Sequence, residues 1–334
     1  MPRSDDLLGL LAAEVEAAVT ARRAPWFDPE EGEAVLLPDD EGRGHWVGAP
    51  SLFVEADGTL LLTYRRRRPR DGSPDERGYL AAIAQSTDGG SSFSDIWSLS
   101  KHEVGTSSLE RCCLRPSPGG PSPGGGWHLY TSWEDPPESG RWRVDVMSAS
   151  SPTGFSAASA RPVVTAAEVG VDAVKDPHLV IGAGGGPEGT GPELVMYVST
   201  FLTPHGPAPT YYATSRDGLQ FDWQGEALGV GTGWDAYQAR ISSVMPFESG
   251  FVAYYDGAAS FADDTEERCG LAVSVDLRTW RRVTTTGPAL VSPHATGSLR
   301  YADVSRYGGR WWVYYEYARA DGSHELRRNV LAGP

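Results

Sequence analysis

Three acidic residues of this sequence stand where a carboxyl group could exchange protons with a bound molecule. Glu110, Asp176 and Asp303 each lie at or near the start of a segment that is otherwise rich in β-forming residues. A charge at the start of a buried strand needs a partner or a function, because burial of an isolated charge is costly. His178 and Tyr301 are their close neighbours in the sequence and could also transfer protons. We therefore take Asp176, Glu110, Asp303, His178 and Tyr301 as the candidate catalytic residues.

Polar and aromatic side chains at the starts of the same segments, and at the ends of the segments that follow them, could hold a substrate. Arginine recognises carboxylates and other anions through paired N–H groups, and aromatic rings suit sugar-binding surfaces. The candidate binding residues are Trp46, Arg111, Arg115, Tyr237, Gln238, Arg240, Arg300 and Glu316. Asp235 and Asp256 could reach the same place. A purely structural network of buried ion pairs is the alternative for the whole set.

The cysteines and histidines give no pattern for a metal or a disulfide. The sequence has three cysteines, Cys112, Cys113 and Cys269, and neither a CxxC motif nor a Cys/His metal spacing. We predict no metal and no cofactor. A nucleophilic Cys112 or Cys113, with its pKa lowered by Arg111 and Arg115, is an alternative.

A short phrase recurs in the chain and indicates its architecture. Segments 86–93, 215–221 and 274–280 share a Ser-x-Asp start and an aromatic residue, and 148–155 is a degenerate copy. The repeat period of about 60 residues is typical of stacked or radially arranged sheets. The aspartate can bond backbone amides, glycine can take the left-handed conformation, and the aromatic ring can pack between sheets. We interpret the phrase as a turn, and its aspartates are not catalytic candidates.

The strands predicted within each period have a constant order. An inner strand such as 48–54 is followed by a Gly-containing turn and a second strand such as 60–65, and a third strand leads into the phrase. Second strands recur five times, whereas the phrase occurs four times. The last unit therefore lacks a fourth strand, which residues 33–37 could supply, so that no sheet edge stays free. We predict an all-β, five-bladed β-propeller over residues 31–334, with its ring closed by an N-terminal strand that completes the last blade.

Residues 1–30 are predicted to form a short N-terminal α-helix, at 7–22, and a lead-in. Leucines and valines fall at helical spacing, and Pro25 ends the pattern. The helix should pack across the propeller, and it could also support a homodimer. This segment lacks the basic start and apolar core of a signal peptide, and no run has transmembrane length. The expected location is therefore cytoplasmic.

The amino-acid composition limits the classes of molecule that this chain is expected to bind. The net charge of −15 disfavours nucleic acid and anionic membrane surfaces. The only lysines are Lys101 and Lys175, and this bias towards arginine is typical of a GC-rich bacterial genome. A small-molecule substrate, sugar-like or anionic, is the expected partner.

Segment 175–179, Lys-Asp-Pro-His-Leu, resembles the Asp-Pro segment of the third blade in five-bladed glycoside hydrolases of the arabinanase, xylosidase and invertase type. The resemblance implies that Asp176 orients a general acid and stabilises an oxocarbenium-like transition state. These families also carry an Asp on the first inner strand and a Glu on the fourth. Here Gly48-Ala49-Pro50 and Tyr237-Gln238-Ala239-Arg240 stand at those places, so the catalytic set is degenerate.

Glycoside hydrolysis needs one carboxylic acid and a second carboxylate, which leaves three hypotheses. The first is a glycoside hydrolase-like enzyme with relocated carboxylates, in which Asp176 pairs with Glu110, Asp235, Asp256, Asp303 or Glu316. The second is a non-hydrolytic enzyme of small-molecule metabolism that carries out a cyclisation, elimination or rearrangement. The third is a propeller that binds a sugar without chemistry.

Overall fold

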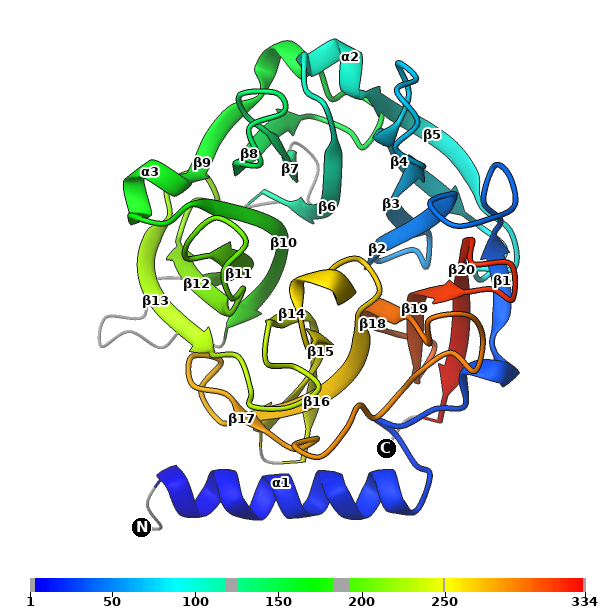
Figure 1. The fold of residues 1–334 in the computed structure, drawn as a ribbon. Coiled ribbons are helices and arrows are strands. Elements are labelled where there is room, and N and C mark those ends of the chain that lie inside the picture. The colour runs from blue at the N-terminus through cyan, green and yellow to red at the C-terminus, as the bar shows by residue number, and fades with distance from the viewer. Residues whose placement is uncertain (1–3, 118–124, 183–192, 249, 333–334) are drawn as a thin grey trace.

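Antiparallel strands that follow one another along the chain build most of this protein (Figure 1). The structure is a computed structural model and describes residues 4–117, 125–182, 193–248 and 250–332. Within these residues three sheets have four strands each, and every strand pairs with the next one in the chain. The three sheets comprise β6 (Leu109–Pro116), β7 (Trp127–Glu134), β8 (Trp142–Ala149) and β9 (Arg161–Thr165); β10 (Ala173–Gly182), β11 (Glu193–Phe201), β12 (Thr210–Ser215) and β13 (Asp222–Leu228); and β14 (Gln238–Phe247), β15 (Gly250–Ala258), β16 (Arg268–Ser274) and β17 (Arg281–Arg282).

The remaining sheet has eight strands and joins the two ends of the chain. One antiparallel group comprises β2 (Trp46–Val54), β3 (Leu60–Arg68), β4 (Arg77–Ser86) and β5 (Ser94–Ser100), and the other comprises β18 (Leu299–Tyr307), β19 (Arg310–Ala318), β20 (His324–Leu331) and β1 (Glu33–Leu36). A single parallel residue pair, Trp46 with His324, connects the groups. The N-terminal strand β1 pairs with the last strand β20, as the sequence predicts.

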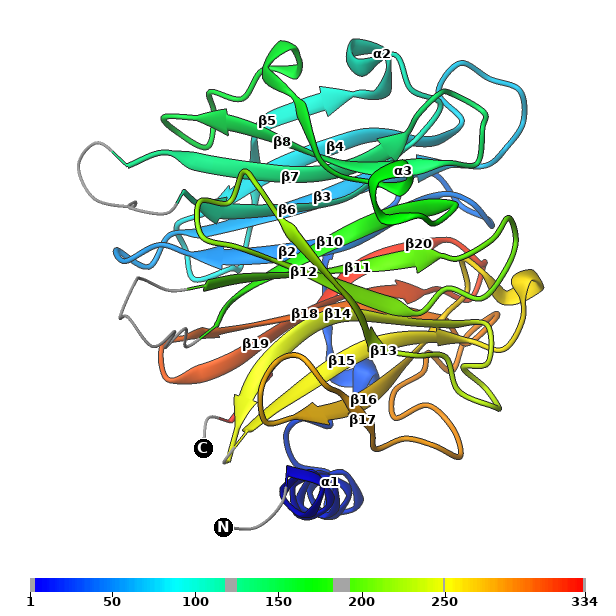
Figure 2. The same cartoon turned by 90° about the vertical axis from the view of Figure 1, so that its left-hand side faces the viewer.

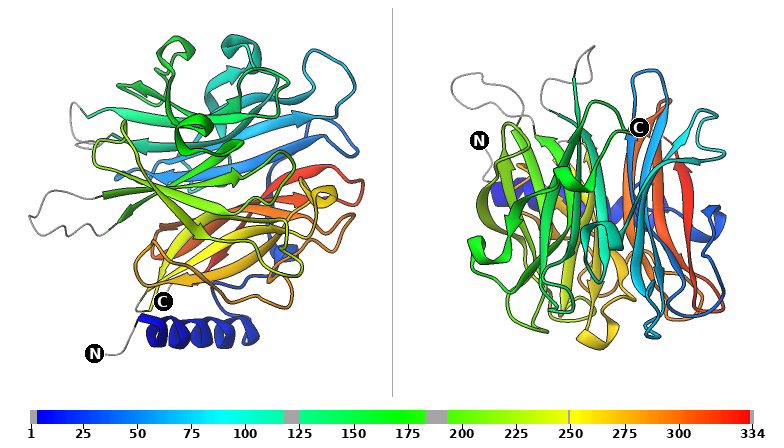
Figure 3. Two further views of the ribbon diagram at one scale, coloured as in Figure 1. Left: turned by 60° about the vertical axis from the view of Figure 1, so that its left-hand side comes forward. Right: turned by 90° about the horizontal axis from the view of Figure 1, so that it is seen from above.

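Five strands, β2, β6, β10, β14 and β18, lie nearest the centre of the molecule (Figure 1). Each contacts the next, and β18 contacts β2, so that they surround a common axis. Figures 2 and 3 show the sheets from the side and from above, with the connecting loops gathered at two opposite faces. Every one of the five strands has a register shift within its first half. Such bulges turn side chains away from the regular alternation and often lie beside functional sites.

The Ser-x-Asp phrases are turns, which confirms their interpretation. In the first one, Asp88 Oδ1 accepts hydrogen bonds of 3.0 Å from the amides of Ser91 and Ser92. The equivalent Asp217 and Asp276 bind two amides each in the same way. The aromatic residue of each phrase packs on a ring of another strand group, in the pairs Phe93–Tyr314, Phe155–Trp97, Phe221–Tyr130 and Trp280–Tyr197. The phrase therefore fastens neighbouring sheets together.

The N-terminal helix α1 (Ser4–Thr20) lies against the outer side of β16 and β17. Leu8, Leu11 and Val15 are buried in the same apolar cluster as residues of β14 to β16. Between α1, the lead-in and the ends of β14, β19 and β20 lies a cleft of about 850 Å³. The short helices are η1 (Pro29–Glu31), α2 (Lys101–Val104), η2 (Ala157–Ser159), α3 (Ala166–Val169) and η3 (Phe261–Asp263). Over the described ranges, the helices are too short or too polar to cross a bilayer.

Candidate active site

The bulges bring side chains of the central strands together at the end where these strands begin. Ala49, Asp176 and Tyr301 occupy corresponding positions in β2, β10 and β18 and have positive φ angles of 51°, 59° and 53°. Non-glycine residues rarely adopt this conformation, and when they do they often mark functional sites. The conformation places Asp176 and Tyr301 next to each other across the centre, with 3.4 Å between Tyr301 Oη and Asp176 Oδ2.

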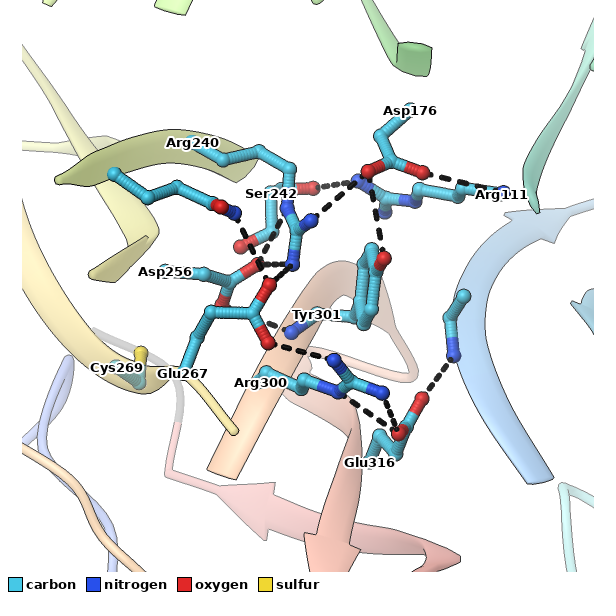
Figure 4. Close-up of polar contacts among 12 residues, drawn as sticks. Arg111, Asp176, Arg240, Ser242, Asp256, Glu267, Cys269, Arg300, Tyr301 and Glu316 are labelled. Atoms are coloured by element: carbon cyan, nitrogen blue, oxygen red, sulfur yellow. Dashed lines mark hydrogen bonds and ion pairs between the residues drawn. The ribbon is translucent and has the colours of Figure 1, made fainter. Parts of the chain in front are cut away.

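Arg240, near the start of β14, lies at the centre of a set of buried charged and polar side chains, which we call the arginine group (Figure 4). Its Nη1 donates to Asp176 Oδ2 at 2.9 Å, and its Nε and Nη2 donate to Asp256 Oδ2 at 3.0 and 2.9 Å. Its Nη2 also lies 3.0 Å from Glu267 Oε1. Arg240 and these three carboxylates are each at most 1% exposed. One guanidinium thus compensates three buried carboxyl groups.

The aromatic ring of Tyr301 packs against the guanidinium groups of three arginines. The guanidinium of Arg240 lies over its ring at 3.9 Å from the centroid, and those of Arg300 and Arg65 lie at 5.2 and 5.4 Å. The Tyr301 amide donates to Asp256 Oδ1 at 2.9 Å. Burial raises the pKa of the Tyr301 phenol, so the hydroxyl keeps its proton and can donate it in a hydrogen bond to Asp176.

A second arginine extends the group towards β2. Arg300 donates to Glu267 Oε2 at 2.6 Å and to Glu316 Oε1 at 2.8 and 2.6 Å. The other oxygen of Glu316 accepts from the Ala49 amide at 3.2 Å. A Cβ atom at Gly48 would lie 2.1 Å from Glu316 Oε2, so only glycine leaves room for this carboxylate. Strand β2 has no carboxylate of its own, and the carboxylate of Glu316, from β19, lies beside its backbone instead.

Asp176 and Asp256, two of the three carboxyls bound to Arg240, have pKa values shifted in opposite directions. Burial opposes the ionisation of Asp176, yet Arg240, Lys175 and Arg65 together hold its pKa below the usual value. For Asp256 burial outweighs the attraction of Arg240 and raises the pKa to about 6. One group is therefore a carboxylate over the physiological range, while the other exchanges a proton near its lower end.

The structure places the other three predicted catalytic residues beside this group. Asp303 lies two residues along β18, where it accepts hydrogen bonds of 2.8 Å from Arg111 Nη2 and from a backbone amide of β2. Nδ1 of His178 is 3.6 Å from Asp303 Oδ1, and burial lowers the pKa of this imidazole well below its usual value. Glu110 forms an ion pair with Arg65, which connects it to Tyr301.

The predicted binding residues fall into two sets. Trp46 stacks on His324 with 4.7 Å between ring centroids, and Gln238 Nε2 donates to Glu267 at 3.0 Å, so both join the arginine group. Arg111, through its backbone amide and Asp303, also belongs to it. Arg115 instead donates to backbone carbonyls of β6 and β10 further along the axis. Tyr237 packs against Phe261 at 5.9 Å.

Sequence reasoning missed Glu267 and His324. Glu267 comes from the connection between β15 and β16, and His324 Nδ1 lies 2.8 Å from Glu316. The only signal for Glu267 is the acidic pair that it forms with Glu266, directly before an apolar strand. His324 gave no signal, because its role depends on the contact between β20 and β2.

Neither metal nor thiol chemistry finds support in this group. Among the residues that the structure describes, no three His, Cys, Asp or Glu side chains could share a metal ion. The alternative of a nucleophilic cysteine is wrong for Cys112, because burial raises its pKa to about 12 despite the nearby arginines. All three thiols are free and buried.

Among known proteins, this chain has a similarity of structure but no match by sequence. No family model and no curated protein matches the sequence. The structure is similar to that of RS223 β-xylosidase, with 13% identity, a TM-score of 0.58 and 90% and 95% of the two chains covered. A glycosyl hydrolase from Bacteroides ovatus has 12% identity, a TM-score of 0.59 and coverages of 90% and 88%. For the GH43_1 enzyme from Xanthomonas citri the values are 14%, 0.56, 90% and 91%. At such low identity the likeness concerns the fold, and this chain has the propeller fold of glycoside hydrolases.

Proposed function

We propose that this chain is a glycoside hydrolase-like enzyme that acts on a glycoside or a similar polar small molecule, with Asp176 and Asp256 as its acid/base pair. The observation that carries the proposal is that Asp176 and Asp256, two of the three buried carboxyls on the Arg240 guanidinium, have pKa values shifted in opposite directions. Paired titratable groups whose environments separate their pKa values are typical of acid/base sites. Near pH 6 Asp256 is about half protonated. It would protonate the leaving oxygen as the glycosidic C–O bond breaks, while ionised Asp176 would stabilise the positive charge of the transition state and accept the proton of the water that attacks the sugar carbon.

The positions of the carboxylates support a relocated catalytic set. Asp256 pairs in register with Arg240, and Glu316 pairs in register with Arg300. Both carboxylates come from second strands, β15 and β19. In this proposal they replace the carboxylates that the resemblance expects on the first strands of the first and fourth units. Glu110 and Asp303 then position Arg65 and Arg111, and His178 lies beside Asp303.

We infer five blades and two regions from the same architecture. The blades are β2–β5, β6–β9, β10–β13, β14–β17, and β18–β20 completed by β1. The single parallel pair between β2 and β20 supports a division of the eight-stranded sheet into two blades. Residues 31–334 form the propeller, and residues 1–30 are the helix and its lead-in. A homodimer through the outer side of α1 and a cytoplasmic location stay predictions.

A non-hydrolytic enzyme of small-molecule metabolism is the second candidate. The observation that favours it is the concentration of guanidinium groups around one ring, since Arg65, Arg111, Arg240 and Arg300 all lie within 6.0 Å of the Tyr301 centroid. Such a group suits the stabilisation of a developing negative charge. Binding of a sugar without chemistry would appear as affinity without turnover.

The test is turnover of a panel of nitrophenyl and methyl glycosides by the wild type and by two variants. Asp176→Asn should lower kcat for every substrate by about 10²- to 10⁴-fold, the usual contribution of a catalytic carboxyl. Asp256→Asn should lower kcat strongly for methyl glycosides and weakly for nitrophenyl glycosides, because a good leaving group needs no proton. Glu134→Gln is the matched control, since Glu134 is a buried carboxylate that pairs with Arg77 outside the group.

The pH profile is a second readout of the same roles. Activity should rise as the pH falls through about 6, because Asp256 becomes protonated. It should fall again only below the usual carboxyl range, where Asp176 becomes protonated. Equal losses in Asp256→Asn for both leaving groups, or full activity of Asp176→Asn, would show that the assigned roles are wrong.

A further inference from the structure

The chain segment 259–267 connects β15 to β16 and brings Glu267 into the candidate active site. This connection lies at the end of the sheet where β14 begins, because β14 and β15 are antiparallel. In Figure 1 its helical turn η3 appears in gold near the centre, and Figure 2 shows it projecting from that face. Asp176, Asp256 and Tyr301 are each at most 1% exposed. A substrate can reach them only if a part of this face moves.

Glu267 inserts from this segment between the two central arginines. Its Oε1 accepts from Gln238 Nε2 and lies 3.0 Å from Arg240 Nη2, while its Oε2 accepts from Arg300 Nη1 at 2.6 Å. Three donors from β14 and β18 thus converge on the two oxygens of one planar carboxylate (Figure 4). Each oxygen is thus paired with one guanidinium, and such charge-assisted contacts suit the binding of a carboxylate ligand. We define these three residues, Gln238, Arg240 and Arg300, as the arginine clamp.

Glu267 differs from the other carboxylates bound to the clamp in its attachment to the fold. Asp256 and Glu316 are members of β15 and β19 and are fixed in register opposite the arginines that they bind. Glu267 lies at the end of a connection whose Thr265 has a φ of 92°. A β-branched residue with such an angle is strained, by about 1–3 kcal/mol. The backbone carbonyl of Glu267 accepts hydrogen bonds from the Leu299 amide and Ser298 Oγ, so displacement concerns its side chain and the part of the segment before it.

We propose that the arginine clamp is the subsite for the carboxylate of an acidic sugar, a uronic acid or its glycoside, and that Glu267 occupies this subsite until such a ligand displaces it. The inference rests on the proposed function, since it names the class of substrate for the same site. A uronate carboxylate can replace the Glu267 carboxylate charge for charge. A neutral sugar brings no carboxylate, so the departure of Glu267 would leave the buried donors Gln238 Nε2 and Arg300 Nη1 without the charged acceptor that they bind. The clamp thereby selects acidic over neutral sugars.

The experiment is isothermal titration calorimetry of the full chain with glucuronate and galacturonate and with the neutral sugars glucose and galactose. The wild type should bind at least one uronate and neither neutral sugar. Glu267→Gln keeps the shape of the side chain but removes the competing charge, so it should bind that uronate about tenfold more tightly, equivalent to about 1.4 kcal/mol. Glu266→Gln is the matched control and should bind like the wild type, because Glu266 contacts Thr296 and His324 instead of the clamp.

A second variant tests the clamp without any sugar. Glu267→Ala removes the internal carboxylate, so free acetate should raise the Tm of this variant and leave the Tm of the wild type unchanged. Chloride at the same ionic strength is the control for salt. Absence of this rescue, equal uronate affinity in Glu267→Gln and the wild type, or neutral sugars bound as tightly as uronates would each overturn the proposal.

The outcomes separate this inference from the proposed function. Uronate binding that responds to Glu267→Gln, without turnover of any glycoside or glucuronide, would support the subsite and refute the hydrolase. Turnover of neutral glycosides that depends on Asp176, with no uronate binding, would support the hydrolase and refute the subsite.

Discussion

Replacement of Arg240 by methionine tests whether one guanidinium holds the centre of the protein together. The change keeps an unbranched side chain but removes the partner of Asp176, Asp256 and Glu267, at 2.9, 2.9 and 3.0 Å. Loss of one partner of a buried ion pair lowers the free energy of unfolding by about 3–5 kcal/mol. An unfolding entropy of about 2.1 cal/mol/K per residue over 334 residues converts 1 kcal/mol to about 1.4 °C. Arg240→Met should therefore lower the Tm by about 4–7 °C at neutral pH.

The sign of the pH dependence separates lost ion pairs from lost packing. Without Arg240 the folded-state pKa values of the orphaned carboxyls should rise above those of the unfolded chain. A group with a raised folded-state pKa contributes stability at low pH and loses it as the pH rises. The difference in Tm between the wild type and Arg240→Met should consequently be largest near pH 8 and smaller near pH 5.

Differential scanning calorimetry across this pH range measures the effect directly. Arg278→Met is the control, because the pair between Arg278 and Glu193 is solvent-exposed at 2.9 Å, and such pairs contribute about 0–1 kcal/mol. A loss of Tm in Arg240→Met no larger than that in Arg278→Met would show that Arg240 does not hold the centre together. A difference from the wild type that does not change with pH would show that its ion pairs are not the cause.

Three further predictions concern other parts of the fold. Gly48→Ala should lower both kcat and Tm, because the new methyl group would lie 2.1 Å from Glu316 Oε2. The control is Gly233→Ala, whose new methyl group would have no atom within 4 Å, and it should leave kcat and Tm unchanged in the same assays. Trp280→Ala should lower the free energy of unfolding in urea by about 3–5 kcal/mol and leave the ligand affinity of the folded protein unaltered; a change in affinity would contradict a purely structural turn. The Cys112 thiol, whose pKa burial raises to about 12, should react with Ellman's reagent only after denaturation, and fast labelling of the native protein would contradict its burial.

Local signals in the sequence were enough to predict the elements and their order. The Ser-x-Asp phrases carry their own turn chemistry, since Asp88 binds amides three and four residues later. Strand alternation and the recurring phrase then led to the architecture, including the pairing of β1 with β20. The helix α1 begins and ends within three residues of the prediction. Each of these features depends on interactions between residues that are close in the chain, or on a period that the sequence displays.

The composition of the site was predictable only in part. Asp176, Tyr301, Arg240 and Arg300 were found because charged or polar groups at the starts of buried strands are conspicuous. The pairing among them was not predictable, because each partner comes from a different strand or loop and a shift of one residue reverses the direction of a side chain. Glu267 was missed for this reason, since nothing in the sequence shows where its segment crosses the sheets.

The sequence by itself determined that the chain folds into β-sheets around its inner strands and that carboxylates and arginines gather at one end of these strands. Only the tertiary structure decided which carboxylate meets which arginine, and hence that Asp176 is held ionised while the pKa of Asp256 rises to about 6. The physical reason is that charge, burial and hydrogen bonding act over a few ångströms in space. At the centre of this fold, residues within that distance come from different strands and loops, and Tyr301 and Asp176 are 125 positions apart in the chain.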